Sequence, residues 1–116
     1  MPLHDFARIP VEQMNPAFAR QVIHGEKMTI ALVRLAKGSS VPLHHHPNEQ
    51  ICVMQSGKLL FVVDGEEQVI SPGHALRIPP DVPHRVEALE DSVAYDIFAE
   101  RREDWIRGDD SYLRTS

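Results

Sequence analysis

Short apolar runs, separated by turns that contain glycine or proline, recur along most of the chain. The turns that separate them include Gln55–Gly57, Ser71–Gly73 and Pro79–Pro83. Short strands spaced in this way are typical of a β-sandwich or β-barrel. The sequence therefore predicts an all-β fold, with a brief helix only at Glu103–Arg107. The predicted strands lie at residues 28–36, 51–54, 59–63, 68–70, 75–78, 84–88 and 93–98.

Local signals add detail at three places. Asp64-Gly65 lies between two apolar runs and predicts a tight β-hairpin. Phe18–Ile23 is a candidate for one further strand, which we expect at a sheet edge. An open edge is an aggregation hazard, so this strand favours pairing with a second subunit in a homodimer. In the polar tail, Trp105 and Tyr112 are expected to pack on the barrel or on that subunit.

Composition narrows the class of protein. A chain of 116 residues, 42% of them hydrophobic, is the size of one domain, and we expect residues 1–116 to form it. The net charge of −5 argues against a nucleic-acid partner. The longest strongly apolar run, Leu59–Val63, is too short for a membrane span, and no apolar signal segment is visible at the N-terminus. The single cysteine, Cys52, fits a reducing compartment, so a cytoplasmic location is expected.

Histidines at close spacing provide the candidate chemistry. In an extended chain the side chains of His44 and His46 point to the same side, and Gln50, four residues after His46, points to that side as well. His84 follows the stiff Pro79–Pro83 loop. Imidazole nitrogens and an amide oxygen are ligands for a first-row divalent cation. Three or four such ligands leave a coordination position open, as catalytic sites require. The competing interpretation is a polar loop that binds no metal.

Two segments resemble the motifs of the cupin family. Gly38–Gln50, closing at Gly57, is similar to the first cupin motif, and Gly73–Pro79 with Asp81 and His84 is similar to the second. The resemblance covers about residues 28–98. It implies a small antiparallel double-sheet jelly-roll barrel with an N-terminal strand segment at 1–27 and a C-terminal tail at 99–116.

This sequence departs from the cupin pattern at three positions. Gln50 replaces the usual Glu ligand, Asp81 replaces a Gly, and Ala88 replaces an Asn. The first change matters most, because a neutral ligand set leaves the metal's charge uncompensated and favours an anionic guest. Nine of the 12 basic residues are Arg, which also suits an anionic ligand.

The stretch Asp96–Trp105 resembles the matching segment of cupins of the KdgF type, which open the ring of unsaturated uronates from pectin or alginate. The resemblance implies metal ligation by His44, His46, Gln50 and His84. It further implies a catalytic acid/base role for Asp96, contact of Phe98 with the substrate, and a grip of Arg102 on the substrate's carboxylate. From the residues alone, an inward Asp96 in an apolar strand is either such an acid or one half of a structural ion pair with Arg77, Arg85 or Arg102.

The remaining candidates have simpler alternatives. Arg77 is a possible second clamp for the carboxylate, or else a solvated arginine on the barrel surface. The side chains of Cys52 and Met54 point to the same side of the strand as Gln50, and they either line the cavity or pack in the core. The function predicted is metal-dependent ring opening and ketonisation of a 4,5-unsaturated uronate, with one nickel, zinc, manganese or iron ion. A metal-dependent dioxygenase and a non-enzymatic sugar- or metal-binding cupin are the alternatives.

Overall fold

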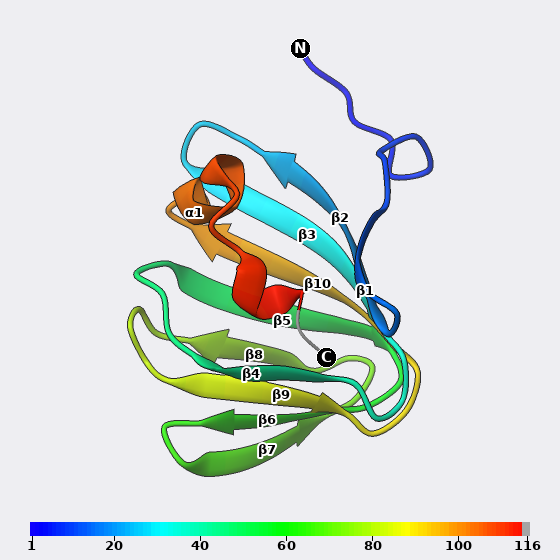
Figure 1. The fold of residues 1–116 in the computed structure, drawn as a ribbon, viewed down its shortest axis with the longest axis vertical. Helices are drawn as coiled ribbons and strands as arrows, with labels where there is room; N and C mark the ends of the chain where they lie inside the picture. Colours follow the sequence, from blue (N-terminus) through cyan, green and yellow to red (C-terminus); the bar gives the residue numbers. More distant parts are fainter. Residues whose placement is uncertain (115–116) are drawn as a thin grey trace.

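Two antiparallel β-sheets face one another and form a barrel (Figure 1). The computed structural model describes residues 1–114. The strands are β1 (Glu12–Asn15), β2 (Phe18–His24), β3 (Met28–Leu35), β4 (Ser40–His44), β5 (Glu49–Ser56), β6 (Leu59–Val63), β7 (Glu66–Ile70), β8 (Ala75–Ile78), β9 (His84–Ala88) and β10 (Ser92–Ala99). A short helix α1 (Glu103–Arg107) and a 3-10 turn η1 (Ser111–Leu113) follow. The predicted all-β jelly roll with a brief C-terminal helix is confirmed.

The strand order explains why the fold is a jelly roll. The six-stranded sheet has the order β1-β2-β3-β10-β5-β8, and the four-stranded sheet has the order β4-β9-β6-β7. From β3 onward the chain passes repeatedly from one sheet to the other. As a result β10, the last strand, lies between β3 and β5, in the middle of the larger sheet.

Alternation along the strands builds the core between the sheets. On β5 the side chains of Gln50, Cys52 and Met54 are buried, while Ile51 between them is exposed. Cys52 and Met54 belong to the apolar core, as one of the two expectations had it. Trp105 and Tyr112 pack against this core from the C-terminal tail, as predicted.

The hairpin signal at Asp64-Gly65 is confirmed. These two residues join β6 to β7, and both have positive φ, 50° for Asp64 and 82° for Gly65. Positive φ at both central positions is the geometry that favours Asp-Gly in a two-residue hairpin turn.

The N-terminal part differs from the expectation. The strand predicted at Phe18–Ile23 exists as β2, but β1 pairs with it and forms the sheet edge instead. The prediction missed β1 because Met14 is its only apolar residue. It also missed β4, whose Pro42 and polar residues read as a loop. The open edge proposed for Phe18–Ile23 is therefore wrong, and it no longer supports a dimer. Within residues 1–114 no helix is long and apolar enough to cross a membrane.

Candidate metal centre

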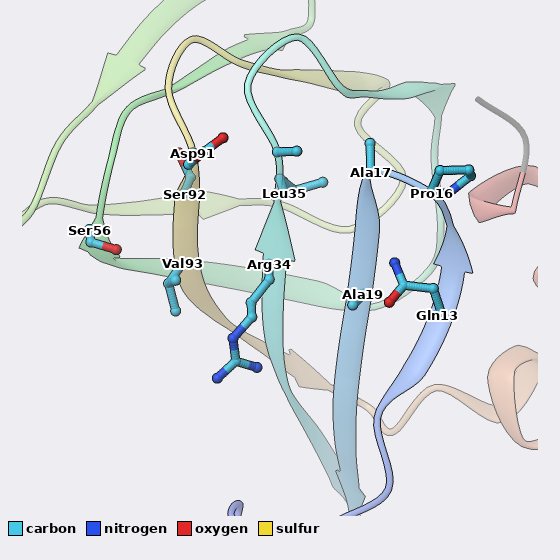
Figure 2. A pocket seen from close by; sticks show the side chains of 11 residues that line it. Gln13, Pro16, Ala17, Ala19, Arg34, Leu35, Ser56, Asp91, Ser92 and Val93 are labelled. Carbon is cyan, nitrogen blue, oxygen red and sulfur yellow. The ribbon is translucent and has the colours of Figure 1, made fainter.

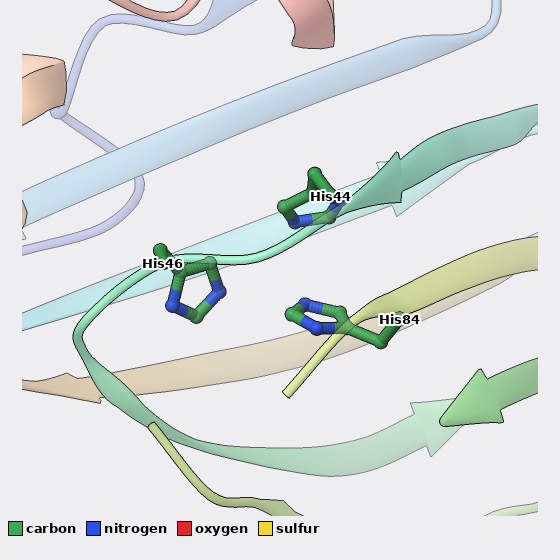
Figure 3. A group of neighbouring side chains, drawn as sticks. All are labelled: His44, His46 and His84. Carbon is green, nitrogen blue, oxygen red and sulfur yellow. The ribbon is translucent and has the colours of Figure 1, made fainter. Parts of the chain in front are cut away.

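Three imidazole rings converge at one end of the four-stranded sheet (Figure 3). His44 ends β4 and is paired across the sheet with His84, which begins β9, while His46 lies in the loop after β4. The ring centroids are 4.3 Å apart for His44 and His84, and 5.0 Å apart for His46 and His84. One ligand nitrogen from each of the three rings lies within 4.8 Å of the others. This cluster, called the His cluster below, could hold a metal ion. His45 is exposed, as the alternation predicted.

The backbone fixes the tautomer of each ring. The Nδ1 atoms lie 2.7 Å from the Pro42 carbonyl oxygen for His44, 3.0 Å from that of Asn48 for His46, and 2.8 Å from that of Val82 for His84. A carbonyl oxygen only accepts, so Nδ1 carries the hydrogen in all three rings. The Nε2 lone pairs are then left for a ligand, the arrangement that metal-binding histidines normally have.

Electrostatics keep the three imidazoles neutral. Burial is the main cause, and it lowers the pKa of His44 to about 4 and that of His46 to about 3. Burial likewise lowers the pKa of His84, and the positive charge of Arg102 lowers the pKa of all three rings further. A neutral imidazole is the form that binds a metal.

Two observations fit a cation within the cluster. The Nε2 atom of His84 is buried and has no hydrogen-bond partner among residues 1–114. The Nε2 atom of His46 lies 3.2 Å from Oε1 of Gln50, whose own Nε2 donates to Asp96 Oδ1 at 3.0 Å. Both His46 Nε2 and Gln50 Oε1 are therefore acceptors that face each other. Unpaired buried acceptors are costly, and a divalent cation between them removes the cost.

Asp96 is linked to this cluster through Gln50. It accepts from Gln50 and is hydrogen-bonded to the thiol of Cys52, its partner on β5. The residue keeps some exposed surface, but its carboxyl group is enclosed by protein, and this desolvation raises its pKa. Burial, followed by the charge of Asp96, raises the pKa of the Cys52 thiol. None of the ion pairs found in residues 1–114 involves Asp96, although the charge of Arg102 acts on it.

Arg102 packs against the ring of Phe98, which also contacts the ring of His46. It is 1% exposed, and its guanidinium carbon is 4.7 Å from the Phe98 ring centre and 4.4 Å from that of Trp105. Its Nε and Nη2 donate to the carboxylate of Asp104 at 3.0 and 2.8 Å. Nη2 also donates to the Tyr112 hydroxyl at 2.8 Å. Arg102 thus lies beside the site with two of its three nitrogens already bonded.

The sequence profile described as the cupin domain matches residues 31–98, more than half of the chain. The protein belongs to the cupin family. The matched region contains all three histidines of the cluster together with Gln50 and Asp96, whereas Arg102 and the tail that follows it lie outside.

Individual relatives sharpen the comparison. The pectin degradation protein KdgF of Dickeya dadantii is 28% identical over 84% of this cupin and 91% of its own length. The structure of KdgF from Halomonas sp. superposes with a TM-score of 0.78 at 28% identity, covering 83% of this chain and 92% of that one. An RmlC-like cupin from Shewanella frigidimarina superposes with a TM-score of 0.84 at 22% identity, covering 89% of this chain and 94% of that one, and shows the shared fold.

A small cavity brings most of the predicted site residues of this cupin together. Its volume is about 50 Å³. His44, His84, Gln50, Asp96 and Phe98 line it, and so does Arg102. The remaining lining comes from the barrel interior and from three residues of the tail that local pattern did not mark as site residues: Trp105, Tyr112 and Leu113.

His46 belongs to the His cluster but lines a neighbouring hollow, and Arg77 is the one predicted site residue that lies away from both the cluster and the cavity. Its neighbours on β8, Leu76 and Ile78, are turned inward, so Arg77 points outward. Its exposed side chain donates to Glu49 at 2.6 Å. The structure therefore gives Arg77 the surface position that was the alternative to a carboxylate clamp.

A larger hollow of about 470 Å³ lies at the end of β10 away from Phe98 (Figure 2). It is open and shallow, and its polar groups bond to the protein itself: Arg34 donates to Gln21, and Asp91 accepts from the Lys37 backbone N–H. No cluster of metal-ligating side chains lies there among residues 1–114. Chemistry rather than size places the candidate site at the histidines.

Proposed function

We propose that this cupin is a metal-dependent enzyme that opens the ring of 4,5-unsaturated uronate monosaccharides. The observation that carries the proposal is the buried Asp96 carboxyl group, one hydrogen bond from Gln50 at the His cluster, with Arg102 on the same cavity. The resemblance to KdgF proteins from two bacteria supports the substrate class.

The metal would be held by four neutral ligands. His44, His46 and His84 offer their Nε2 atoms, and Gln50 offers Oε1 because its amide nitrogen is committed to Asp96. A divalent cation supplies Lewis acidity, which polarises substrate oxygens. Nickel, zinc, manganese and iron all suit such a ligand set. The neutral ligands leave the site positively charged, which favours a carboxylate-bearing guest.

The reaction is an isomerisation in which the chain's task is to move a proton. The bond between the anomeric carbon and the ring oxygen breaks, and the anomeric hydroxyl loses its proton, so that the anomeric carbon becomes an aldehyde. The former ring oxygen becomes the oxygen of a ketone at C5 as C4 gains a proton. Asp96, whose burial raises its pKa, would supply the proton to C4. Arg102 Nη1, which has no hydrogen bond to a residue in 1–114, would bind the substrate's carboxylate, and Phe98 would contact the sugar.

One assay tests this proposal. Metal content is measured in the purified protein, and 4,5-unsaturated galacturonate is added under strictly anaerobic conditions. The proposal expects the ultraviolet absorbance of the conjugated double bond to disappear with metal present and to persist after chelation. Loss of absorbance only when oxygen is supplied and consumed would instead identify a dioxygenase. Binding of the sugar without turnover would identify a binding protein.

We also propose that the cupin forms a homodimer through the outer face of the six-stranded sheet. The outward side chains of β5 and β10 are apolar there: Ile51 is 37% exposed, and Val53 and Ile97 are half-buried. Contiguous apolar surface of this kind marks interaction sites. Light scattering coupled to size exclusion should give the mass of two chains, and a single-chain mass at micromolar concentration would contradict the dimer.

A further inference from the structure

The residues that follow β10 fold back over the cavity. We call residues 101–114 the C-terminal cover. Tyr112 lies with its ring centre 4.9 Å from that of His44, and Leu113 is buried in the core. Both line the cavity, as does Trp105 of the same segment. Figure 1 shows the cover, in orange and red, crossing the barrel in front of β10 and β5.

The cover leaves too little room for an organic guest. A space of about 50 Å³ holds a cation and a few water molecules. Sites that enclose a small organic ligand run from roughly 300 Å³ upward. Part of the cavity wall must therefore move before a ring-sized molecule enters this cavity, and the barrel strands on the other sides are tied into their sheets.

The two halves of the cover are attached differently. The first half is fixed through the backbone: Asn48 Nδ2 donates to the carbonyl oxygens of Glu100 and Arg101, and the Arg102 N–H donates to Thr29 Oγ1 at 2.9 Å. Helix α1 then ends at Gly108, whose φ of +82° is the left-handed conformation in which glycine is favoured. Because glycine tolerates a wide range of backbone angles, the chain can change direction at this residue.

The second half, residues 109–114, is held by side chains. Its backbone hydrogen bonds run within the cover, from the Asp109 N–H to Asp104 O, from the Leu113 N–H to Asp110 O and from the Arg114 N–H to Ser111 O. Its polar attachments to the barrel are the ion pair between Asp110, 2% exposed, and Arg20, 2% exposed, on β2, and a longer, partly exposed contact of Arg114 with Glu12 on β1 at 4.0 Å. Arg20 has a second carboxylate partner, Glu12 on β1, at 3.2 Å. If Asp110 moves away, Glu12 still neutralises Arg20, so opening does not leave an unpaired buried charge.

We propose that Asp110 controls access to the His cluster. Its ion pair with Arg20 holds residues 109–114 over the cavity, and a guest enters when the pair opens and the chain pivots at Gly108. The inference depends on the His cluster binding a metal, but on no particular substrate. The competing entrance is a hollow of about 350 Å³ beside His46, lined also by Asn48, Arg101 and Arg107.

Asp110→Asn and Asp109→Asn provide a matched pair of variants. Each removes one negative charge, but Asp109 is exposed and, within residues 1–114, its side chain pairs with the exposed Arg107 alone. The first measurement is the rate at which excess EDTA removes zinc from zinc-loaded protein. We expect about tenfold or faster removal from Asp110→Asn, because losing about 1.4 kcal/mol of closing free energy multiplies the open population by ten. Asp109→Asn should stay within about twofold of the wild type.

The second measurement needs no metal. Trp105 is the only tryptophan and lies partly buried in the first half of the cover, on the same cavity as Tyr112 and Leu113 of the second half, so acrylamide quenching of its fluorescence reports opening. Quenching should rise in Asp110→Asn and not in Asp109→Asn. A chain that ends at Gly108 should show both effects more strongly while circular dichroism still reports the β-fold. Zinc removal and quenching at wild-type levels in both Asp110→Asn and the shortened chain would overturn the proposal and favour entry beside His46. Because no sugar is used, failure of the proposed uronate activity would not affect this result.

Discussion

The wall of the cavity and its cover are built on different principles. On the wall, each histidine is oriented by a carbonyl oxygen two residues away in the sequence, and β4 and β9 hold two of the three rings in register. On the cover, Arg102 and Asp110 are held by ion pairs to Asp104 and Arg20. Local contacts to the backbone thus orient the metal-ligand side chains, whereas ion pairs between side chains hold the residues of the cover.

This difference suits two tasks, namely holding the metal ligands in one geometry and allowing the cover to open. A ligand set needs one geometry before the metal arrives, and short-range backbone bonds provide it. A cover must release, and the contacts of its second half can break without unfolding the sheets. Removing a histidine of the wall should therefore abolish metal binding, and changes in the cover should alter access and affinity.

The largest effect is expected from removing a ligand of the wall. His46→Ala should reduce metal affinity by about a hundredfold or more, since it deletes one of three converging nitrogens. The fold should remain, because the apolar core excludes His46. Metal content after dialysis and the thermal midpoint of the metal-free protein are the measurements. His45→Ala, at the exposed neighbouring position, is the control and should retain metal. Global unfolding of His46→Ala would show that the ring is structural.

Asp96→Asn tests the proton-transfer step between wall and cover. Turnover of 4,5-unsaturated galacturonate should fall by about two to four orders of magnitude if Asp96 moves the proton. Metal content should not change, because the three cluster nitrogens are untouched. Asp109→Asn serves as the control for charge. A decrease of less than threefold would remove Asp96 from the mechanism.

Gln50→Glu tests the charge of the wall with the ligand geometry kept. A carboxylate at this position neutralises part of the metal's charge and faces Asp96 instead of donating to it. We expect an anionic product to bind about tenfold more weakly, measured by calorimetry on metal-loaded protein. Tighter binding would contradict the argument that neutral ligands favour an anionic guest.

The sequence predicted the wall much better than the cover. Strands β6, β8 and β9 begin and end where the apolar pattern placed them, because alternation and turn residues are local signals. In the cover, helix α1 also lies where it was predicted, but the contacts that hold the cover in place were not predicted. The convergence of His44, His46 and His84 followed from parity and from the cupin resemblance. The pairing of Asp110 with Arg20 joins residues 90 positions apart, and no periodicity encodes it. Strand β1 was missed for a related reason, since its stability comes from pairing with β2 rather than from its own apolar residues.

The smallest effect is expected at Arg77, which contrasts with Arg102. Both arginines were candidates for binding a carboxylate, but Arg77 lies on the outer surface, where Glu49 pairs with it, and Arg102 lines the cavity. Arg77→Ala should leave the KM for the uronate within about twofold and change stability by less than about 1 kcal/mol, as for exposed ion pairs. Arg102→Lys should raise KM far more, because an ammonium group cannot reproduce the planar fork that Asp104 holds in place. If instead Arg77→Ala raised KM as much as Arg102→Lys, the carboxylate would have to bind at the outer edge of the sheet, and the cover would lose its role in recognition.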